Sequence, residues 1–315
     1  MRALCNPDGL GTHVYEVVKR PLAFLQRGSI ALSLLGCSGC STLSHGFLNP
    51  AGPVAGGQRE LFLIALGLTL LVIIPVFVLA PWLVWRYRRG NDAATYKPDW
   101  TFSWPLEILA WGVPIVVVSI LSVFLWSSTH QLDPYQPLAS DRKPLQVQVV
   151  GLDWKWLFIY PQQGVASLNQ LVLPVGRPVH LTLTTDTVMQ SLLIPHLGGQ
   201  VYAMAGMRTQ LSLQADHAGS YLGENTQYNG RGFQQQKFRA LAMSAADFAQ
   251  WLHRARHSGK SLGCARYKQL TRREPVPGVQ LYATVQAHLF DWIVDKYRQH
   301  PLPGCGAAPG DPAHA

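Results

Sequence analysis

The sequence predicts a membrane protein of mixed class, in which a two-helix transmembrane hairpin precedes an all-β domain and a short helical C-terminal extension. Two long uncharged apolar runs predict the helices, and a later change to period-two alternation predicts the strands. Composition agrees, because 48% of the 315 residues are apolar and only 14% are charged, against about 25% in soluble domains. The net charge of +9 is too sparsely distributed to indicate nucleic-acid binding.

The transmembrane hairpin is predicted over residues 60–130. Residues 61–83 and 108–129 contain no charged side chain. At about 1.5 Å rise per residue, each run is long enough to cross a hydrocarbon core of about 30 Å. The connecting loop, residues 84–106, carries four Lys or Arg and two Asp. This excess predicts a cytoplasmic loop, so both ends of the mature chain are expected outside the cytoplasm.

The first 36 residues are predicted to form a lipoprotein-type signal peptide. Basic residues precede a short apolar stretch, SIALSLLGC, which ends at Cys37. Such a junction predicts cleavage before Cys37 and attachment of lipid to that cysteine. The alternative is an uncleaved apolar N-terminus with an incidental cysteine. Residues 37–59 are expected to lead to the first span outside the cytoplasm.

The remainder is predicted as a β domain and a helical arm. Six β-rich runs separated by Gly, Pro, Asn and Asp predict one antiparallel domain over residues 144–243. An S-x-x-D signal at Ser244 then opens an arm, residues 244–298, which contains two amphipathic stretches. The Pro- and Gly-rich residues 299–315 predict a disordered tail.

Three motifs carry a resemblance to a known family: DWKWLFIYP at 153–161, VMQSLLIPHLGGQVYAMAGM at 188–207 and YNGRGF at 228–233. Together with the hairpin, they resemble subunit II of bo-type ubiquinol oxidases, within the heme-copper oxygen reductases. The resemblance covers most of residues 37–298. It implies a cupredoxin-like Greek-key barrel on the periplasmic face of a bacterial inner membrane. It also implies a partner, subunit I, which carries hemes and a copper ion, together with smaller membrane subunits.

The cytochrome c oxidase branch of that family holds a dinuclear copper centre, CuA, in this domain through two thiolates, two imidazoles and a thioether. The corresponding positions here lack all of these ligands. In family order, the residues that replace His, Cys, Cys, His and Met are Gln190, Asn225, Asn229, Phe233 and Gln236. Amides and a phenyl ring cannot supply bridging thiolates. We therefore expect no CuA, no other metal or cofactor and no catalytic residue in this chain.

Two further features gain meaning from the resemblance. Trp154 resembles the residue where cytochrome c delivers electrons in the copper branch, but without copper that role has no acceptor. In a strand, Trp154 and Trp156 are expected to share one face, and we interpret both as packing or subunit-contact residues. Glu107, near the start of the second span, resembles a glutamate at the inner mouth of a proton pathway into subunit I. The alternative is a carboxylate that simply reaches the interface.

Two weaker ligand groups and a basic segment complete the candidates. His196, Met204 and Met207 form a possible soft-metal group, but barrel methionines more often fill the core. His253, His257 and Cys264 have a spacing that zinc can use, without a recognisable fourth ligand. Residues 231–273 contain ten basic residues and one acidic residue. This bias could hold the arm against anionic lipid or an acidic partner, and the alternative is a solvated basic face.

The sequence and its resemblance together predict a non-catalytic subunit II of a proton-pumping ubiquinol oxidase. In that reading, ubiquinol is the substrate of the complex rather than of this chain. One alternative is a free-standing envelope lipoprotein with a cupredoxin-like binding domain. Another is a cytochrome c oxidase subunit II, which the missing ligands disfavour.

Overall fold

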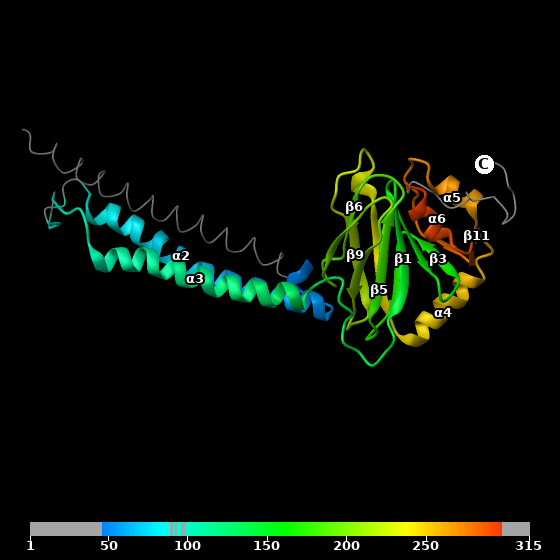
Figure 1. Cartoon of the computed structure of the whole chain (residues 1–315), viewed down its shortest axis with the longest axis horizontal. Helices are drawn as coiled ribbons and strands as arrows, with labels where there is room; N and C mark the ends of the chain where they lie inside the picture. Colours follow the sequence, from blue (N-terminus) through cyan, green and yellow to red (C-terminus); the bar gives the residue numbers. More distant parts are fainter. Residues whose placement is uncertain (1–45, 89–90, 92, 96–98, 298–315) are drawn as a thin grey trace, which may run out of the picture.

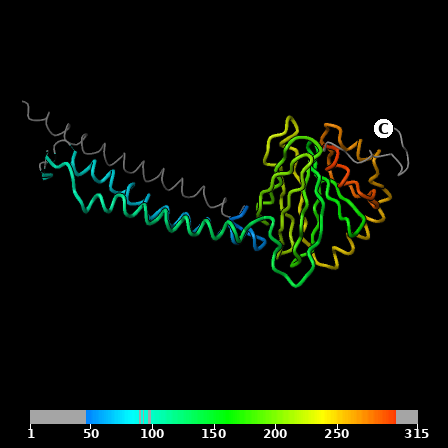
Figure 2. The backbone as a smooth tube through the Cα atoms, viewed as in Figure 1, coloured from blue at the N-terminus to red at the C-terminus, as the bar shows by residue number. Residues whose placement is uncertain are grey.

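A computed structural model describes residues 46–88, 91, 93–95 and 99–297 as a helical hairpin, a two-sheet β barrel and a C-terminal arm (Figure 1). The hairpin extends from one side of the barrel, and the arm lies on the opposite side (Figures 1 and 2). This order of elements confirms the predicted fold class. The expected signal peptide, residues 1–36, the lipid site at Cys37 and the tail at 299–315 lie outside the described residues.

The hairpin consists of α2 (Pro53–Arg86) and α3 (Trp104–Gln131). Their most apolar windows have mean hydropathies of 3.0 and 2.6. Most of their large apolar side chains are exposed rather than covered by the rest of the chain. By length and composition, both helices can therefore cross a membrane. Pro75, Pro81 and Pro114 lie inside the helices without ending them, as expected where lipid surrounds a span.

The barrel is built from two sheets with strand orders β12-β3-β2-β1-β5-β8 and β4-β10-β9-β6-β7. A short third sheet pairs β11 with β13. In chain order the strands are β1 (Leu145–Leu152), β2 (Lys155–Tyr160), β3 (Val165–Leu168), β4 (Gln170–Pro174), β5 (Val179–Thr185), β6 (Gln190–Leu193), β7 (Gln200–Ala203), β8 (Thr209–Leu213), β9 (Gly219–Asn225), β10 (Lys237–Met243), β11 (Ser261–Leu262), β12 (Gln280–Tyr282) and β13 (Thr284–Val285).

The expectation of a purely antiparallel domain is wrong, because two pairs of strands run parallel. β1 pairs with β5, and β4 pairs with β10, both in parallel register. Parallel neighbours need a crossover rather than a hairpin, and here β2 to β4 form the crossover between β1 and β5. Period-two alternation shows which face of a strand is buried but not which way its neighbour runs.

Two apolar clusters lie on the two faces of the six-stranded sheet. Trp156 and Phe158 point into the cluster between the sheets, whereas Leu157 and Ile159 join a second cluster with the arm. Every residue of β2 is consequently buried. This explains the nearly uninterrupted apolar run in that strand, since each alternate side chain has a different core to enter.

The arm combines short helices with a strand that joins the barrel. Ser244 caps α4, where its hydroxyl accepts from the Asp247 backbone N–H at 3.1 Å, which confirms the S-x-x-D signal. Strand β12 then pairs with β3 at the edge of the six-stranded sheet. The helices outside the hairpin are η3 (Gly46–Leu48), η4 (Phe233–Gln235), α4 (Ala245–Arg256), α5 (Cys264–Leu270) and α6 (Leu289–Asp295).

Candidate functional site

Four side-chain amides meet between β6 and the segment that joins β9 to β10; we call them the amide cluster. Gln236 is the hub, because its Nε2 donates to Gln190 Oε1 at 2.6 Å. Its Oε1 accepts from Asn225 Nδ2 at 3.0 Å and from Asn229 Nδ2 at 2.6 Å. These are four of the five residues that the resemblance assigns to ligand positions of the copper branch. The fold thus brings together residues that lie up to 46 positions apart.

The amide cluster is buried and bonded to the surrounding backbone. Each of the four side chains belongs to a residue at most 6% exposed. Gln190 and Gln236 both donate to Leu152 O at 3.2 Å, and Asn225 Oδ1 accepts from the Ser191 N–H at 2.9 Å. Because an unpaired buried amide is costly, these bonds hold the end of β1, strand β6 and the 225–236 segment together.

The donor set does not fit CuA. Thiolate, imidazole and thioether are missing from the amide cluster, and amide oxygen and nitrogen are poor substitutes for a bridging thiolate. The fifth position, Phe233, packs against Tyr228 instead, with ring centroids 5.7 Å apart. Tyr228 is 71% exposed, so this pair lies at the surface. The chemistry that the arrangement offers is hydrogen bonding between neutral groups.

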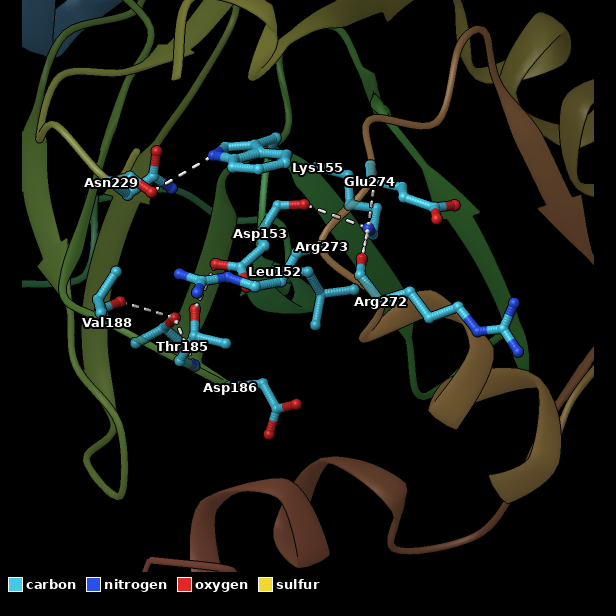
Figure 3. A network of polar contacts seen from close by, with 12 residues as sticks. Leu152, Asp153, Lys155, Thr185, Asp186, Val188, Asn229, Arg272, Arg273 and Glu274 are labelled. Carbon is cyan, nitrogen blue, oxygen red and sulfur yellow. Dashed lines mark hydrogen bonds and ion pairs between the residues drawn. The ribbon is translucent and has the colours of Figure 1, made fainter. Parts of the chain in front are cut away.

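Trp154 and Trp156 occupy different surroundings. Trp154 lies in the turn before β2 with a φ of 63°, so the expectation that both rings share one strand face is wrong. Its Nε1 donates to Asn229 O at 3.3 Å (Figure 3), and a Cβ at Gly232 would lie 2.1 Å from its ring. Trp156 is fully buried against Phe238.

The same turn carries a charged cluster that sequence reasoning missed. Lys155 is 1% exposed, and its Nζ donates to three backbone carbonyls: Asp153 at 3.1 Å, Arg272 at 2.8 Å and Glu274 at 2.7 Å (Figure 3). Three acceptors match the three N–H bonds of an ammonium group. Burial lowers the pKa of Lys155, and the Asp153 and Glu274 carboxylates oppose that shift.

Two buried carboxylates extend this contact between barrel and arm. Asp153 Oδ2 accepts from Arg273 Nε at 3.0 Å, and Asp186 Oδ1 accepts from Lys296 Nζ at 2.8 Å. Burial raises the pKa of Asp186, and its bond to Lys296 offsets the shift only in part. We call the set the arm clamp: Asp153, Lys155, Asp186, the 272–274 loop and Lys296. The sequence signal was a lysine at the start of an apolar strand.

Glu107 lies in the first turn of α3, next to the loop between the helices. Its Oε2 accepts from Trp111 Nε1 at 3.0 Å, one turn along the same helix. The side chain is exposed on the hairpin surface. This position leaves the carboxylate accessible from outside the hairpin.

The weaker candidate ligands do not assemble. The described residues contain no group of three or more His, Cys, Asp or Glu that could hold a metal ion. His253 and His257 stack with ring centroids 4.1 Å apart, and Cys264 is disulfide-bonded rather than a free thiolate. Met207 is 52% exposed, and His196 Nδ1 lies 2.9 Å from Asn49 O.

Comparison with known proteins agrees with this architecture. Residues 161–235 match the family described as cytochrome C oxidase subunit II, periplasmic domain, and residues 256–300 match the COX aromatic rich motif. Cytochrome bo(3) ubiquinol oxidase subunit 2 of Pseudomonas putida is 45% identical over 283 residues, covering 90% of this chain and 87% of that protein.

Two further relatives show similar extents. Ubiquinol oxidase subunit 2 of Acetobacter aceti is 42% identical, over 85% of this chain and 86% of that protein. Cytochrome bo(3) ubiquinol oxidase subunit 2 of Pseudomonas aeruginosa is 42% identical, over 94% and 88% respectively. The fold defines a chain of the cytochrome c oxidase subunit II type with two candidate membrane spans, and its barrel contains a buried amide cluster. The chain belongs to the family of ubiquinol oxidase subunits 2.

Proposed function

We propose that this chain is the non-catalytic subunit II of a proton-translocating ubiquinol oxidase. In this proposal the neighbouring subunits pass electrons from ubiquinol to oxygen, and this polypeptide holds neither metal nor catalytic residue. The observation that carries the proposal is the amide cluster, in which Gln236 bonds to Gln190, Asn225 and Asn229. These amides hydrogen-bond to one another through all four side chains, and they offer a soft metal ion no thiolate, imidazole or thioether.

The amide cluster then has a structural task. Where CuA ties two loops together by coordinate bonds, Gln236 ties them by hydrogen bonds within the same barrel. Trp154 and Trp156 fit a packing role in this scheme, because one lies on the 229–232 loop and the other fills the core. Electron transfer through either ring would need a redox group close by, and this proposal places no such group in the chain.

The partners follow from family membership. We infer a complex with subunit I, which contributes the hemes and a copper ion, and with smaller membrane subunits. In a bacterial inner membrane, the excess of Lys and Arg in residues 84–106 favours a cytoplasmic loop. Both mature termini and the barrel would then lie in the periplasm, with Cys37 lipidated.

Glu107 is proposed to help proton entry into subunit I. Its location in the first turn of α3, beside the positively biased loop, supports a position near the cytoplasmic surface. A carboxylate near that depth is retained at low cost only where water or a partner reaches it. Glu107→Ala is expected to slow oxygen reduction by the assembled complex, whereas Glu60→Ala, at the other end of the hairpin, should not.

Purification of the tagged full-length chain in mild detergent tests the proposal. We expect co-elution with heme, ubiquinol-dependent oxygen uptake, and no copper beyond the ion of subunit I. Two additional copper ions and oxidation of cytochrome c would instead establish a cytochrome c oxidase subunit. A heme-free chain that elutes alone would establish the free-standing lipoprotein.

A further inference from the structure

We propose that the groove between α2 and α3 binds an acyl chain, and that its occupant is the lipid attached to Cys37 of the same chain. The proposal rests on the lipidation of Cys37 included in the proposed function. It adds where the acyl chain lies and which side chains hold it.

The groove lies in the half of the hairpin nearest the barrel. It has a volume of about 430 Å³ and an almost entirely apolar lining. Its walls are formed by side chains of both helices: Leu61, Phe62, Ile64, Ala65, Leu121 and Leu125. Apolar walls of this kind fit an acyl chain and offer nothing to a polar ligand.

The mouth of the groove has a different character. Gln58 lies there, one turn before Leu61, and its amide has no hydrogen-bond partner among the described residues. Ester and amide carbonyls are the polar groups of an acylated cysteine. A half-buried amide donor above an apolar groove matches that order of groups, polar at the membrane surface and apolar below.

The start of the described chain lies beside this mouth. The ring of Phe47, in η3, contacts that of Phe62 edge to face, with centroids 5.3 Å apart, and Phe62 lines the groove. The Ala51 N–H donates to His196 O at 2.7 Å, which fixes the segment against the barrel. Eight residues, 38–45, lie between Cys37 and Gly46, and the nine steps along this segment reach at most about 30 Å. A lipid on Cys37 must therefore enter the bilayer close to the hairpin.

Packing, rather than the hydrophobic effect, decides between the groove and the surrounding lipid. An acyl chain already lies in hydrocarbon, so moving into the groove removes no apolar surface from water. An acyl chain in the groove makes van der Waals contacts with side chains of both helices. The short connection to Gly46 raises the local concentration of this particular acyl chain above that of free phospholipids.

The test uses the complete complex from cells grown with a photoactivatable diazirine fatty acid. Mass spectrometry of the N-terminal peptide first establishes whether Cys37 is acylated. Irradiation and digestion then identify which peptides become linked to it. We expect crosslinks from the peptide that begins at Cys37 to peptides containing the groove residues, chiefly Leu61 to Ala65 and Leu121 to Leu125.

Matched variants make the result specific. Ala65→Trp fills the groove and should lower the crosslink yield at least about fivefold, whereas Val78→Trp, on the distal half of α2, should leave it unchanged. Phospholipid adducts in the groove, or crosslinks from the acyl chain only to other subunits, would overturn the inference. So would an unmodified Cys37. Ubiquinol oxidase activity of the same preparation reports separately on the proposed function.

Discussion

Removal of the buried ammonium of Lys155 should release the arm from the barrel. Lys155→Met keeps most of the side-chain volume but removes three hydrogen bonds, to the carbonyls of Asp153, Arg272 and Glu274. The bond to Asp153 lies within the barrel, so only the two bonds to Arg272 and Glu274 join the barrel to the arm. At about 1 kcal/mol net for each of these two bonds, the variant is expected to destabilise arm docking by about 2 kcal/mol. Because about 1.4 kcal/mol corresponds to a factor of ten, this loss is about a 30-fold change in the docking equilibrium.

Hydrogen exchange measured by mass spectrometry on the full-length chain in detergent can resolve this change. Amides of α5 and α6 should exchange about 30-fold faster in Lys155→Met, since local opening sets their exchange. Lys237→Met is the control, because that side chain is 52% exposed and 3.9 Å from Glu224, and it should change exchange less than about threefold. If arm protection in Lys155→Met changes by less than about fivefold, the two bonds from Lys155 to the 272–274 loop do not hold the arm.

Three further substitutions test other parts of the structure. Gly232→Ala should cost about 1–3 kcal/mol in urea unfolding, because the new Cβ meets the Trp154 ring at 2.1 Å. Gly259→Ala, with open space around its Cβ but a φ of +70° where Gly232 has −90°, measures the cost of backbone strain without a clash. Ser244→Ala should cost about 1 kcal/mol through loss of the α4 cap. Burial raises the pKa of Asp186 above its usual 3.8, so the folded protein binds that proton more readily than the unfolded chain. Its contribution to stability should therefore rise as pH falls from neutral towards 3.8, and Asp186→Asn should remove that slope from unfolding measured across the whole range from pH 7 to 3.8.

Local signals in the sequence identified elements whose partners are close in the chain. The cap at Ser244 depends on Asp247, three residues away, and the two spans depend only on uninterrupted apolar length. Such features need no knowledge of tertiary structure. The parallel pairing of β1 with β5 was missed because strand direction depends on the route of the crossover.

The arm clamp illustrates a different limit. Lys155 bonds to carbonyls 117 and 119 residues further along the chain, and a backbone carbonyl leaves no residue-specific signal in a sequence. A lysine in an apolar strand indicates that some partner exists, but not which segment provides it. The ligand positions were assigned only through resemblance, since nothing in the spacing of Gln190, Asn225 and Gln236 points to a shared site.

The amide cluster leads to a last prediction, which separates metal binding from structural support. Gln236→Met introduces the residue type that the resemblance assigns to this position in the copper branch, with nearly the same volume. The thioether cannot donate to Gln190 Oε1, and it accepts only weakly from Asn229 Nδ2. Two buried polar groups are then left without a good partner, at about 1–3 kcal/mol each. We expect the free energy of unfolding to fall by about 3 kcal/mol.

The measurement is urea unfolding of the full-length chain in detergent, with copper determined on the same samples. Gln235→Met, at the exposed neighbouring position, should leave stability unchanged within about 0.5 kcal/mol. Gln236→Met should bind no more copper than the parent, because one thioether without thiolates is not a CuA site. Unchanged stability in Gln236→Met would mean that the hydrogen bonds of Gln236 contribute little to the stability of the barrel. A lower free energy of unfolding would mean that the amide hydrogen bonds hold the two loops together. A single residue of the ligand type would then weaken the barrel without restoring a metal centre.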